Sequence, residues 1–235
     1  MGRHSPYIIS NMISVIVRTY NSAAFVEHAL KSIFDQTLPC SFYEIIVVDD
    51  GSSDDTKKIL ARHHGKIRVV FQEHLGAMRA LNVGIKNARG NYIILLDSDD
   101  TFEPAILEKM RALAALHPDA EFIYCDYYEK AMGAGATKII PTGDNIFNCV
   151  AEGILFRKTL LEEIGLYDES LFFPEYDVLI KIYKNHKGLH IPQPLFTYNR
   201  RAGSLTSKKD RVAVGKQELI KKYGDIPEIA QIRNY

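Results

Sequence analysis

The segment NYIILLDSDD, Asn91–Asp100, runs from four consecutive apolar residues, Ile93–Leu96, directly into three carboxylates within four positions. A short apolar run with a polar ending is typical of a strand that is buried on both faces of a sheet. A hydrophobic core does not require such an acidic ending. The carboxylates therefore indicate a polar site where this strand ends.

The same pattern of strand, polar loop and helix occurs three times before this segment. Strands that alternate with helices and are apolar on both faces predict a parallel sheet covered by helices through right-handed crossovers. We therefore expect an α/β fold with a Rossmann-like, mostly parallel sheet. The expected strands are MISVIVRTYN (12–21), YEIIVVDD (43–50), KIRVVFQ (66–72) and NYIILL (91–96), and the helices cover about 22–36, 54–63 and 76–88.

The second half of the sequence is less regular. It predicts a helix over 104–117, a strand over 121–128, a Gly/Ala-rich loop over 130–138, strands near Ile139 and Ile154, and helices near Lys158 and Pro174. Convincing linkers are absent from the sequence, and 235 residues suit one large domain better than two. We expect a single domain.

Composition excludes several classes of function. Lys plus Arg and Asp plus Glu both number 29, so bulk charge gives no reason to expect nucleic acid binding. The three cysteines are widely spaced and predict neither a zinc site nor a disulfide framework. The apolar runs are too short for a membrane span, and the first twelve residues lack a signal core. These features predict a cytoplasmic protein.

Two acidic clusters follow predicted strands: Asp49 with Asp50, and Asp97 with Asp99 and Asp100. Ligands of open α/β sheets bind beyond the carboxyl ends of the strands, so both clusters should face one crevice. Strand alternation predicts that Asp97 and Asp99 point together while Asp100 points away. Paired carboxylates repel unless a cation lies between them, and hard oxygen ligands suit Mg²⁺ or Mn²⁺.

The sequence contains neither GxGxxG nor GxxxxGK[ST], the glycine-rich loops that hold phosphates in dinucleotide-binding proteins and P-loop NTPases. A nucleotide bound in the crevice would therefore have its diphosphate neutralised by metal.

Four segments in this order, ISVIVRTYN, EIIVVDDGSSDDT, ALNVGIKNARGNYIILLDSDD and FFPEYDVLIKIYK, resemble the family 2 inverting glycosyltransferases of the GT-A fold. The resemblance covers about residues 12–206. It implies one GT-A domain over 1–235, with a nucleotide-sugar half over about 12–100 and a smaller acceptor half over about 101–206. A basic helical tail, 207–235, follows.

The resemblance also implies roles for individual residues on the nucleotide side. Thr19, Tyr20 and Asp50 match positions that hold the nucleobase and ribose, Tyr20 by stacking and Asp50 by hydrogen bonding to the base. Asn82 matches the helix at the nucleotide side. These residues would together bind the donor nucleotide.

The metal and the base are implied in the same way. Asp97, Ser98 and Asp99 match the DxD motif, with Asp99 as the direct metal ligand and Asp97 closer to the ribose or to a metal-bound water. Glu175 matches the catalytic base. Asp177, two residues further on, does not share its helical face and is expected either to orient an acceptor or to bind the body of the protein.

Three positions depart from the family pattern. Arg18 replaces the usual proline and could equally be a surface arginine; Glu175 replaces the usual aspartate of the base. Arg201 replaces a histidine that often completes the metal shell. Because arginine cannot ligate a cation, either another group fills that place or Arg200 and Arg201 contact the diphosphate directly.

These features predict metal-assisted, inverting transfer of a sugar from a nucleotide-diphosphate donor, UDP-sugar above all, to a hydroxyl group in polysaccharide, glycan or glycolipid synthesis. Glu175 would be the general base. A nucleotidyltransferase of similar fold and a non-catalytic sugar-binding relic are the alternatives. The basic tail is either a solvated face or a peripheral contact with the inner face of a membrane carrying a lipid-linked acceptor.

Overall fold

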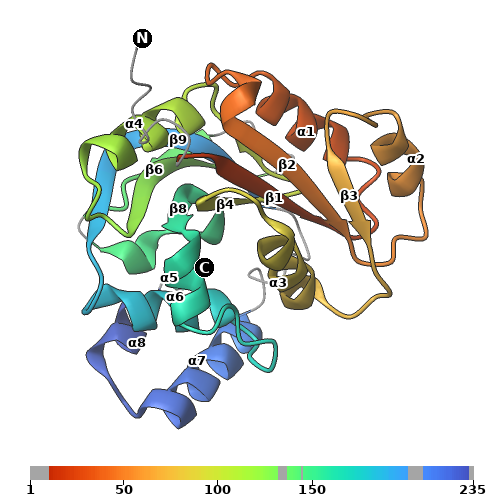
Figure 1. Cartoon of the computed structure of the whole chain (residues 1–235). Coiled ribbons are helices and arrows are strands. Elements are labelled where there is room, and N and C mark those ends of the chain that lie inside the picture. Colours follow the sequence, from red (N-terminus) through yellow and green to blue (C-terminus); the bar gives the residue numbers. More distant parts are fainter. Residues whose placement is uncertain (1–10, 132–136, 144, 201–208, 233–235) are drawn as a thin grey trace.

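The computed structural model describes residues 11–131, 137–143, 145–200 and 209–232. Within these ranges one nine-stranded sheet runs through the molecule, in the order β3-β2-β1-β4-β8-β6-β9-β5, with β7 paired to β6. Helices cover both faces (Figure 1). The predicted α/β fold is confirmed.

The nucleotide-side half of the sheet is parallel. Its strands are β1 (Ile13–Thr19), β2 (Tyr43–Asp49), β3 (Arg68–Phe71) and β4 (Tyr92–Asp97). β1 lies between β2 and β4, so Arg18 is the direct neighbour of Val48 on one side and of Asp97 on the other. This register brings the first polar residues of three strands to one edge of the sheet.

The second half of the sheet is mixed. β8 (Ile154–Arg157) pairs antiparallel with β4 and with β6 (Phe122–Ala131), and β9 (Gly188–Arg200) pairs parallel with β6. The short strands β5 (Thr101–Phe102) and β7 (Thr137–Ile140) are antiparallel to their partners. Of the nine strands in the described part of the chain, β1–β4, β6 and β9 share one direction, so the expected mostly parallel sheet is confirmed.

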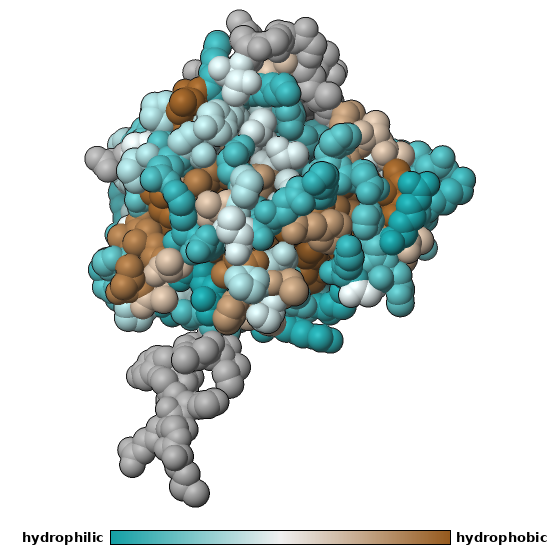
Figure 2. All heavy atoms as spheres, turned by 90° about the horizontal axis from the view of Figure 1, so that it is seen from above, coloured by the Kyte–Doolittle hydropathy of each residue, from teal (hydrophilic) through white to brown (hydrophobic). Residues whose placement is uncertain are grey.

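Eight α-helices lie within the described ranges, and alternate residues of the central strands face two hydrophobic clusters. One cluster packs α3, α5 and α6 against one face, and the other packs α1 and α4 against the opposite face. Figure 2 shows hydrophilic side chains interspersed with apolar groups on the face seen from above. The helices are α1 (Val26–Phe34), α2 (Thr56–Ala61), α3 (Ala77–Asn87), α4 (Ile106–Leu116), α5 (Lys158–Glu163), α6 (Pro174–Tyr183), α7 (Lys209–Tyr223) and α8 (Pro227–Gln231).

The described part of the basic tail folds back onto the domain. Lys222 of α7 pairs with Asp168 at 2.7 Å and with Asp177 at 2.9 Å, and the Lys216 ammonium donates to the carbonyl oxygen of Ile232. Leu219 is buried in the same cluster as α6. These contacts make the tail part of the packed domain. Among the described helices, none has the length and apolar character that crossing a bilayer requires.

The packing of α3 on the sheet depends on Gly84. A Cβ atom at this position would meet Ile16 Cγ2 at 2.4 Å and Val48 Cγ2 at 3.3 Å. Replacing Gly84 by Val should therefore lower the free energy of unfolding by about 1–3 kcal/mol through overpacking, measured by urea denaturation. Lys86→Val, at an exposed position on the same helix, is the matched control. Equal stability of the two variants would contradict this packing.

Candidate active site

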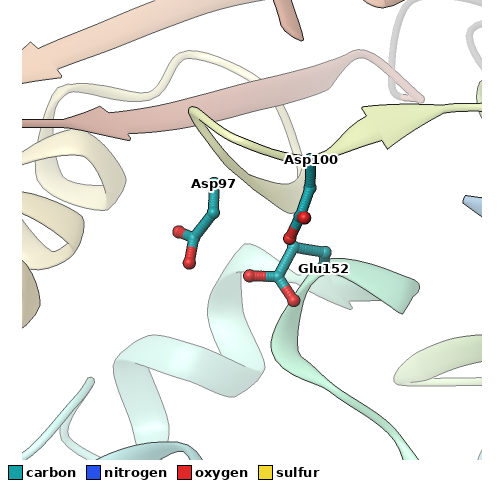
Figure 3. Close-up of side chains that lie close together, drawn as sticks. All are labelled: Asp97, Asp100 and Glu152. Atoms are coloured by element: carbon teal, nitrogen blue, oxygen red, sulfur yellow. The ribbon is translucent and has the colours of Figure 1, made fainter. Parts of the chain in front are cut away.

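Three carboxylates converge where β4 ends: Asp97, Asp100 and Glu152 each place an oxygen within 4.8 Å of the others (Figure 3). β4 stops at Asp97, and the chain then turns so that the Asp100 amide donates to the Asp97 carbonyl at 3.0 Å. Glu152 lies in the short 3-10 helix Ala151–Gly153, directly before β8, which pairs with β4. The cluster thus joins the two halves of the sheet.

The expectation that Asp100 points away from Asp97 is wrong, because Asp100 joins Asp97 in this cluster. The pairing of Asp97 with Asp99 stays a prediction. Alternation requires extended backbone, but the strand ends at Asp97, and the turn brings Asp100 toward Asp97 instead. One Asp100 carboxylate oxygen accepts from the Asn199 amide at 2.7 Å, while the Asp99 carbonyl accepts from the Asn199 side chain at 2.8 Å. Asp100 therefore belongs to the acid cluster, and the end of β9 fixes its position.

Burial makes this cluster costly in its ionised form. Burial, followed by the charges of Asp99 and Asp97, raises the pKa of Asp100 well above its usual range. Burial, with Asp97 and Asp100, does the same for the pKa of Glu152. The buried Asp100 Oδ2 has no hydrogen-bond partner among the described residues. An orphaned carboxylate oxygen between two other carboxylates fits a hard divalent cation such as Mg²⁺ or Mn²⁺.

Arg18 provides the positive charge in this region. Its Nη2 donates to Asp97 Oδ2 at 2.6 Å, its Nε donates to Asp97 Oδ1, and its Nη1 lies 3.6 Å from Glu175 Oε1. The arginine side chain is only 16% exposed, so the reading of Arg18 as a surface residue is wrong. Burial opposes its charge, but Asp97, with Glu175 and Glu152, raises its pKa well above the ordinary value.

Glu175 of α6 lies on the other side of Arg18 from Asp97. It stands in the first turn of α6, after Pro174 at the first helical position, where the helix dipole favours a carboxylate. Burial raises the pKa of Glu175, a shift that Arg18 opposes and Asp97 reinforces. Glu175 is thus a partly buried carboxyl, 25% exposed, with a raised pKa, and one guanidinium links it to a candidate metal ligand. Such a group is a candidate for proton transfer.

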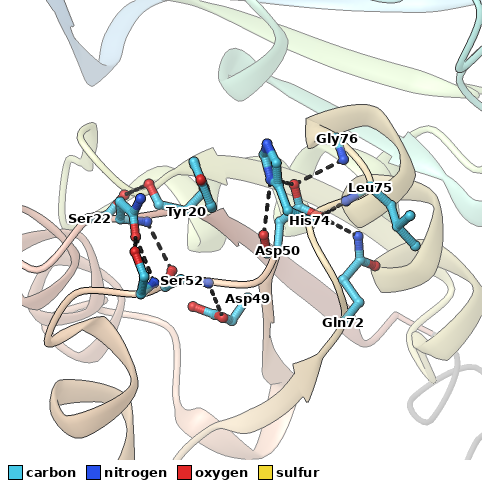
Figure 4. A network of polar contacts seen from close by, with 11 residues as sticks. Tyr20, Ser22, Asp49, Asp50, Ser52, Gln72, His74, Leu75 and Gly76 are labelled. Carbon is cyan, nitrogen blue, oxygen red and sulfur yellow. Dashed lines mark hydrogen bonds and ion pairs between the residues drawn. The ribbon is translucent and has the colours of Figure 1, made fainter.

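Asp50, at the end of β2, organises the neighbouring loop (Figure 4). Its Oδ1 accepts from the Gln72 side chain at 2.6 Å and from the Leu75 amide at 2.9 Å, and its Oδ2 accepts from the Gly76 amide at 3.0 Å. His74 Nδ1 lies 2.8 Å from Oδ2. Asp50 thereby holds the loop between β3 and α3 against the end of β2.

Tyr20 lies next to this loop and is 45% exposed. Its ring stacks on that of His74, with 4.0 Å between centroids and 16° between planes. Thr19 is buried beside it, and its hydroxyl has no hydrogen-bond partner among the described residues. Ser98 donates to the Ser22 hydroxyl at 2.8 Å. The sequence-predicted nucleotide residues at the ends of β1, β2 and β4 therefore surround one edge of the sheet.

Asn82 lies on α3 and connects this helix to the segment before α6. Its amide group donates to the Tyr167 carbonyl at 2.8 Å and to Glu169 at 2.9 Å, and its oxygen accepts from the Tyr167 amide at 3.1 Å. The side chain is buried. These bonds fix the segment 167–169 to α3, and the role of Asn82 at the nucleotide stays a prediction.

Asp177, by contrast, has a fully buried side chain, which pairs with Lys181 and Lys222 at 2.9 Å each and accepts from the Tyr223 hydroxyl. This placement fits the alternative in which Asp177 binds the body of the protein and leaves no surface for an acceptor. Arg200, at the end of β9, lies 3.6 Å from Glu129. Arg201 lies outside the described residues.

The sequence prediction missed three contributors to this site. Glu152 is a single acid within the apolar stretch CVAEGILF, and that isolated charge was the available signal. Gln72 and His74 hold the carboxylate of Asp50 in place. The pattern of apolar residues in a strand does not reveal such side-chain contacts.

Comparison with known proteins places these residues in a family. The sequence profile of the glycosyl transferase family 2 matches residues 14–165, and the chain belongs to this family. GlyG of Streptococcus pneumoniae, named a glycosyltransferase, is 33% identical over 224 residues, which cover 84% of this chain and 73% of that protein. A glycosyltransferase of Rickettsia prowazekii is 31% identical over 195 residues, 75% of this chain and 60% of the relative. The family predicted from the sequence is confirmed.

Solved structures agree on the fold. TarS of S. aureus with UDP-GlcNAc gives a TM-score of 0.70 at 22% identity, over 94% of this chain and 69% of TarS. The mannosyltransferase PcManGT of Pyrobaculum calidifontis with GDP-Man and Mn²⁺ gives 0.68 at 17% identity, over 96% and 69%. The GT-A fold is thereby confirmed. The chain spans about 60% of the length of the first curated relatives that it matches.

Replacing Glu152 by Gln should raise the melting temperature of the metal-free protein at pH 7 by a few degrees, about 1 kcal/mol in a domain of this size. The substitution removes a charge that burial and two neighbouring carboxylates disfavour. Because the folded pKa of Glu152 is raised, the parent protein gains stability from this group as pH falls through that pKa toward the ordinary value of 4.5. The advantage of the variant should therefore shrink toward pH 4.5.

Thermal denaturation in EDTA at both pH values measures this effect. The exposed Glu163→Gln, at the end of α5, should show no such pH-dependent gain. A Glu152→Gln variant that melts below the parent at pH 7 would contradict the assigned repulsion.

Proposed function

We propose that this domain transfers a sugar, with inversion, from a nucleoside-diphosphate donor to a hydroxyl group of a carbohydrate or lipid-linked acceptor. The observation that carries the proposal is the pair of opposed acidic groups at the carboxyl edge of the sheet: the cluster of Asp97, Asp100 and Glu152, and Glu175 across from it. One side suits a leaving diphosphate with its cation, and the other suits a base.

The donor side would bind Mn²⁺ or Mg²⁺ through Asp97 and Asp100, with Glu152 and Asp99 as further carboxylates nearby. Such a cation, when bound, stabilises the negative charge that develops on a departing diphosphate. Tyr20 offers an exposed ring for stacking, and Asp50 holds the adjacent loop. TarS binds UDP and UDP-GlcNAc, and PcManGT binds GDP-Man, which supports a nucleotide sugar; we propose a UDP-sugar.

On the acceptor side, Glu175 would remove the proton from the attacking hydroxyl group. A positioned general base contributes about 10²–10⁴-fold to the rate of such a step. Attack from the face opposite the diphosphate inverts the sugar carbon, and this geometry needs no covalent intermediate on the enzyme. Arg18 lies between the two sides, so its charge is close to both Glu175 and Asp97.

The acceptor belongs, in this proposal, to polysaccharide, glycan or glycolipid synthesis. A nucleotidyltransferase fits less well because the loop VRTYNSAAF after β1 is neither glycine-rich nor basic enough to hold a triphosphate. A peripheral membrane contact through the tail stays a prediction. Two of the tail's cations, Lys216 and Lys222, already bond within the domain, and Lys221 is exposed.

The assignment of the base is tested by Glu175→Gln, which keeps the shape of the side chain and removes its basicity. UDP release from a panel of UDP-sugars with acceptor sugars should fall by about 10²-fold or more, while UDP affinity by calorimetry stays within about twofold. Glu175→Asp should retain measurable transfer if the acceptor can shift by one methylene.

Glu108→Gln is the matched control, because Glu108 is also a carboxylate in the first turn of a helix but is exposed and bonded to Thr37. It should transfer at the parent rate. Undiminished transfer by Glu175→Gln would remove Glu175 from the mechanism, and absence of any transfer by the parent protein would favour the sugar-binding relic.

A further inference from the structure

Arg18 pairs with one of the three candidate metal ligands. It donates to both carboxylate oxygens of Asp97, through Nη2 at 2.6 Å and through Nε, so each oxygen of this carboxylate already accepts one hydrogen bond from a cation. Asp97 is also one of the three members of the acid cluster. A divalent cation that binds Asp97 would therefore compete with the guanidinium for this carboxylate and, in our interpretation, displace it.

The displacement is a competition between two cations for one carboxylate. Arginine stays charged at every physiological pH and its planar fork matches a carboxylate in a bidentate pair, so it is an effective competitor. The pair is only partly accessible, at 16% for the Arg18 side chain and 24% for Asp97, so water screens it weakly.

A released Arg18 has a destination close by. Its Nη1 already lies 3.6 Å from Glu175 and its guanidinium contacts Met78 Sδ of α3 at 3.9 Å, so the side chain links a candidate metal ligand to the candidate base. A diphosphate bound beside these ligands offers oxygens that suit a bidentate guanidinium.

We propose that Arg18 is an internal counter-ion that suppresses metal binding until a nucleoside diphosphate arrives, and that it then exchanges Asp97 for the diphosphate. The inference rests on the proposed function, since it concerns the same donor site. Binding of the diphosphate would draw Arg18 away from Asp97 and so favour metal binding. Binding of the metal would in turn favour binding of the diphosphate.

The coupling is tested by binding of Mn²⁺ alone, with no donor or acceptor, followed by electron paramagnetic resonance. Arg18→Gln should bind Mn²⁺ at least about tenfold more tightly than the parent. A neighbouring arginine lowers the proton affinity of a carboxylate by about tenfold or more, and its loss should strengthen the binding of another cation by a similar factor. In the presence of UDP the advantage of Arg18→Gln should shrink or reverse, since the variant lacks the contact with the diphosphate.

Two further variants keep the test decisive. Arg18→Lys retains a positive charge and therefore protects the fold, but it lacks the fork; its Mn²⁺ affinity should lie between those of the parent and Arg18→Gln. Arg68→Gln is the matched control, because Arg68 also forms a partly buried pair, with Glu44 at 3.2 Å, near the opposite ends of the strands. Its Mn²⁺ affinity should equal that of the parent within about twofold.

Mn²⁺ affinities of Arg18→Gln and Arg18→Lys that do not exceed the parent's would overturn the inference, while leaving the role of Glu175 in transfer untouched. Transfer lost in Glu175→Gln together with unchanged Mn²⁺ binding in the Arg18 variants would separate the two proposals. If neither the parent nor any Arg18 variant binds Mn²⁺, with or without UDP, both the coupling and the metal-assisted donor site are wrong.

Discussion

Repulsion between carboxylates that the fold forces together is the constraint on which this site depends. Asp97, Asp100 and Glu152 lie within 4.8 Å of one another, and Glu175 approaches from a different helix. Desolvation removes the water that would separate such charges elsewhere, so the folded chain must supply a cation or hold protons. Arg18 meets part of this need, and its neighbour relation with Asp97 follows from the pairing of β1 with β4.

The fold was largely predictable because short segments of the sequence are enough to identify most of its strands and helices. Apolar runs ending in polar loops identified β1 to β4 and the helices between them, and ordered motifs identified the family. β9 was missed because GLHIPQPLFTYNR contains two prolines, which usually argue against a central strand. The structure accommodates Pro194 opposite Asp126, where the register between β6 and β9 shifts.

The site was less predictable because its geometry arises between elements. The direction of Asp100 depends on a turn that begins where β4 stops, at Asp97, whereas simple alternation assumes extended backbone as far as Asp100. Glu152 reaches the cluster through an antiparallel pairing of β8 with β4 across more than fifty residues of sequence. The bond between Arg18 and Asp97, however, was within reach, since the two residues are register partners near the ends of neighbouring strands. A motif therefore indicates the role of a residue, but the register of neighbouring strands decides which side chains it contacts.

The central claim is that the carboxyl edge of β1, β2 and β4 holds a divalent cation and a nucleoside diphosphate together. Anomalous scattering from a crystal of the protein with Mn²⁺ and UDP measures this most directly. We expect one manganese peak within about 2–2.5 Å of a carboxylate oxygen of Asp97 or Asp100 and beside the diphosphate, with Arg18 no longer paired with Asp97. Bound UDP with no manganese at this cluster, or manganese bound elsewhere in the chain, would contradict it.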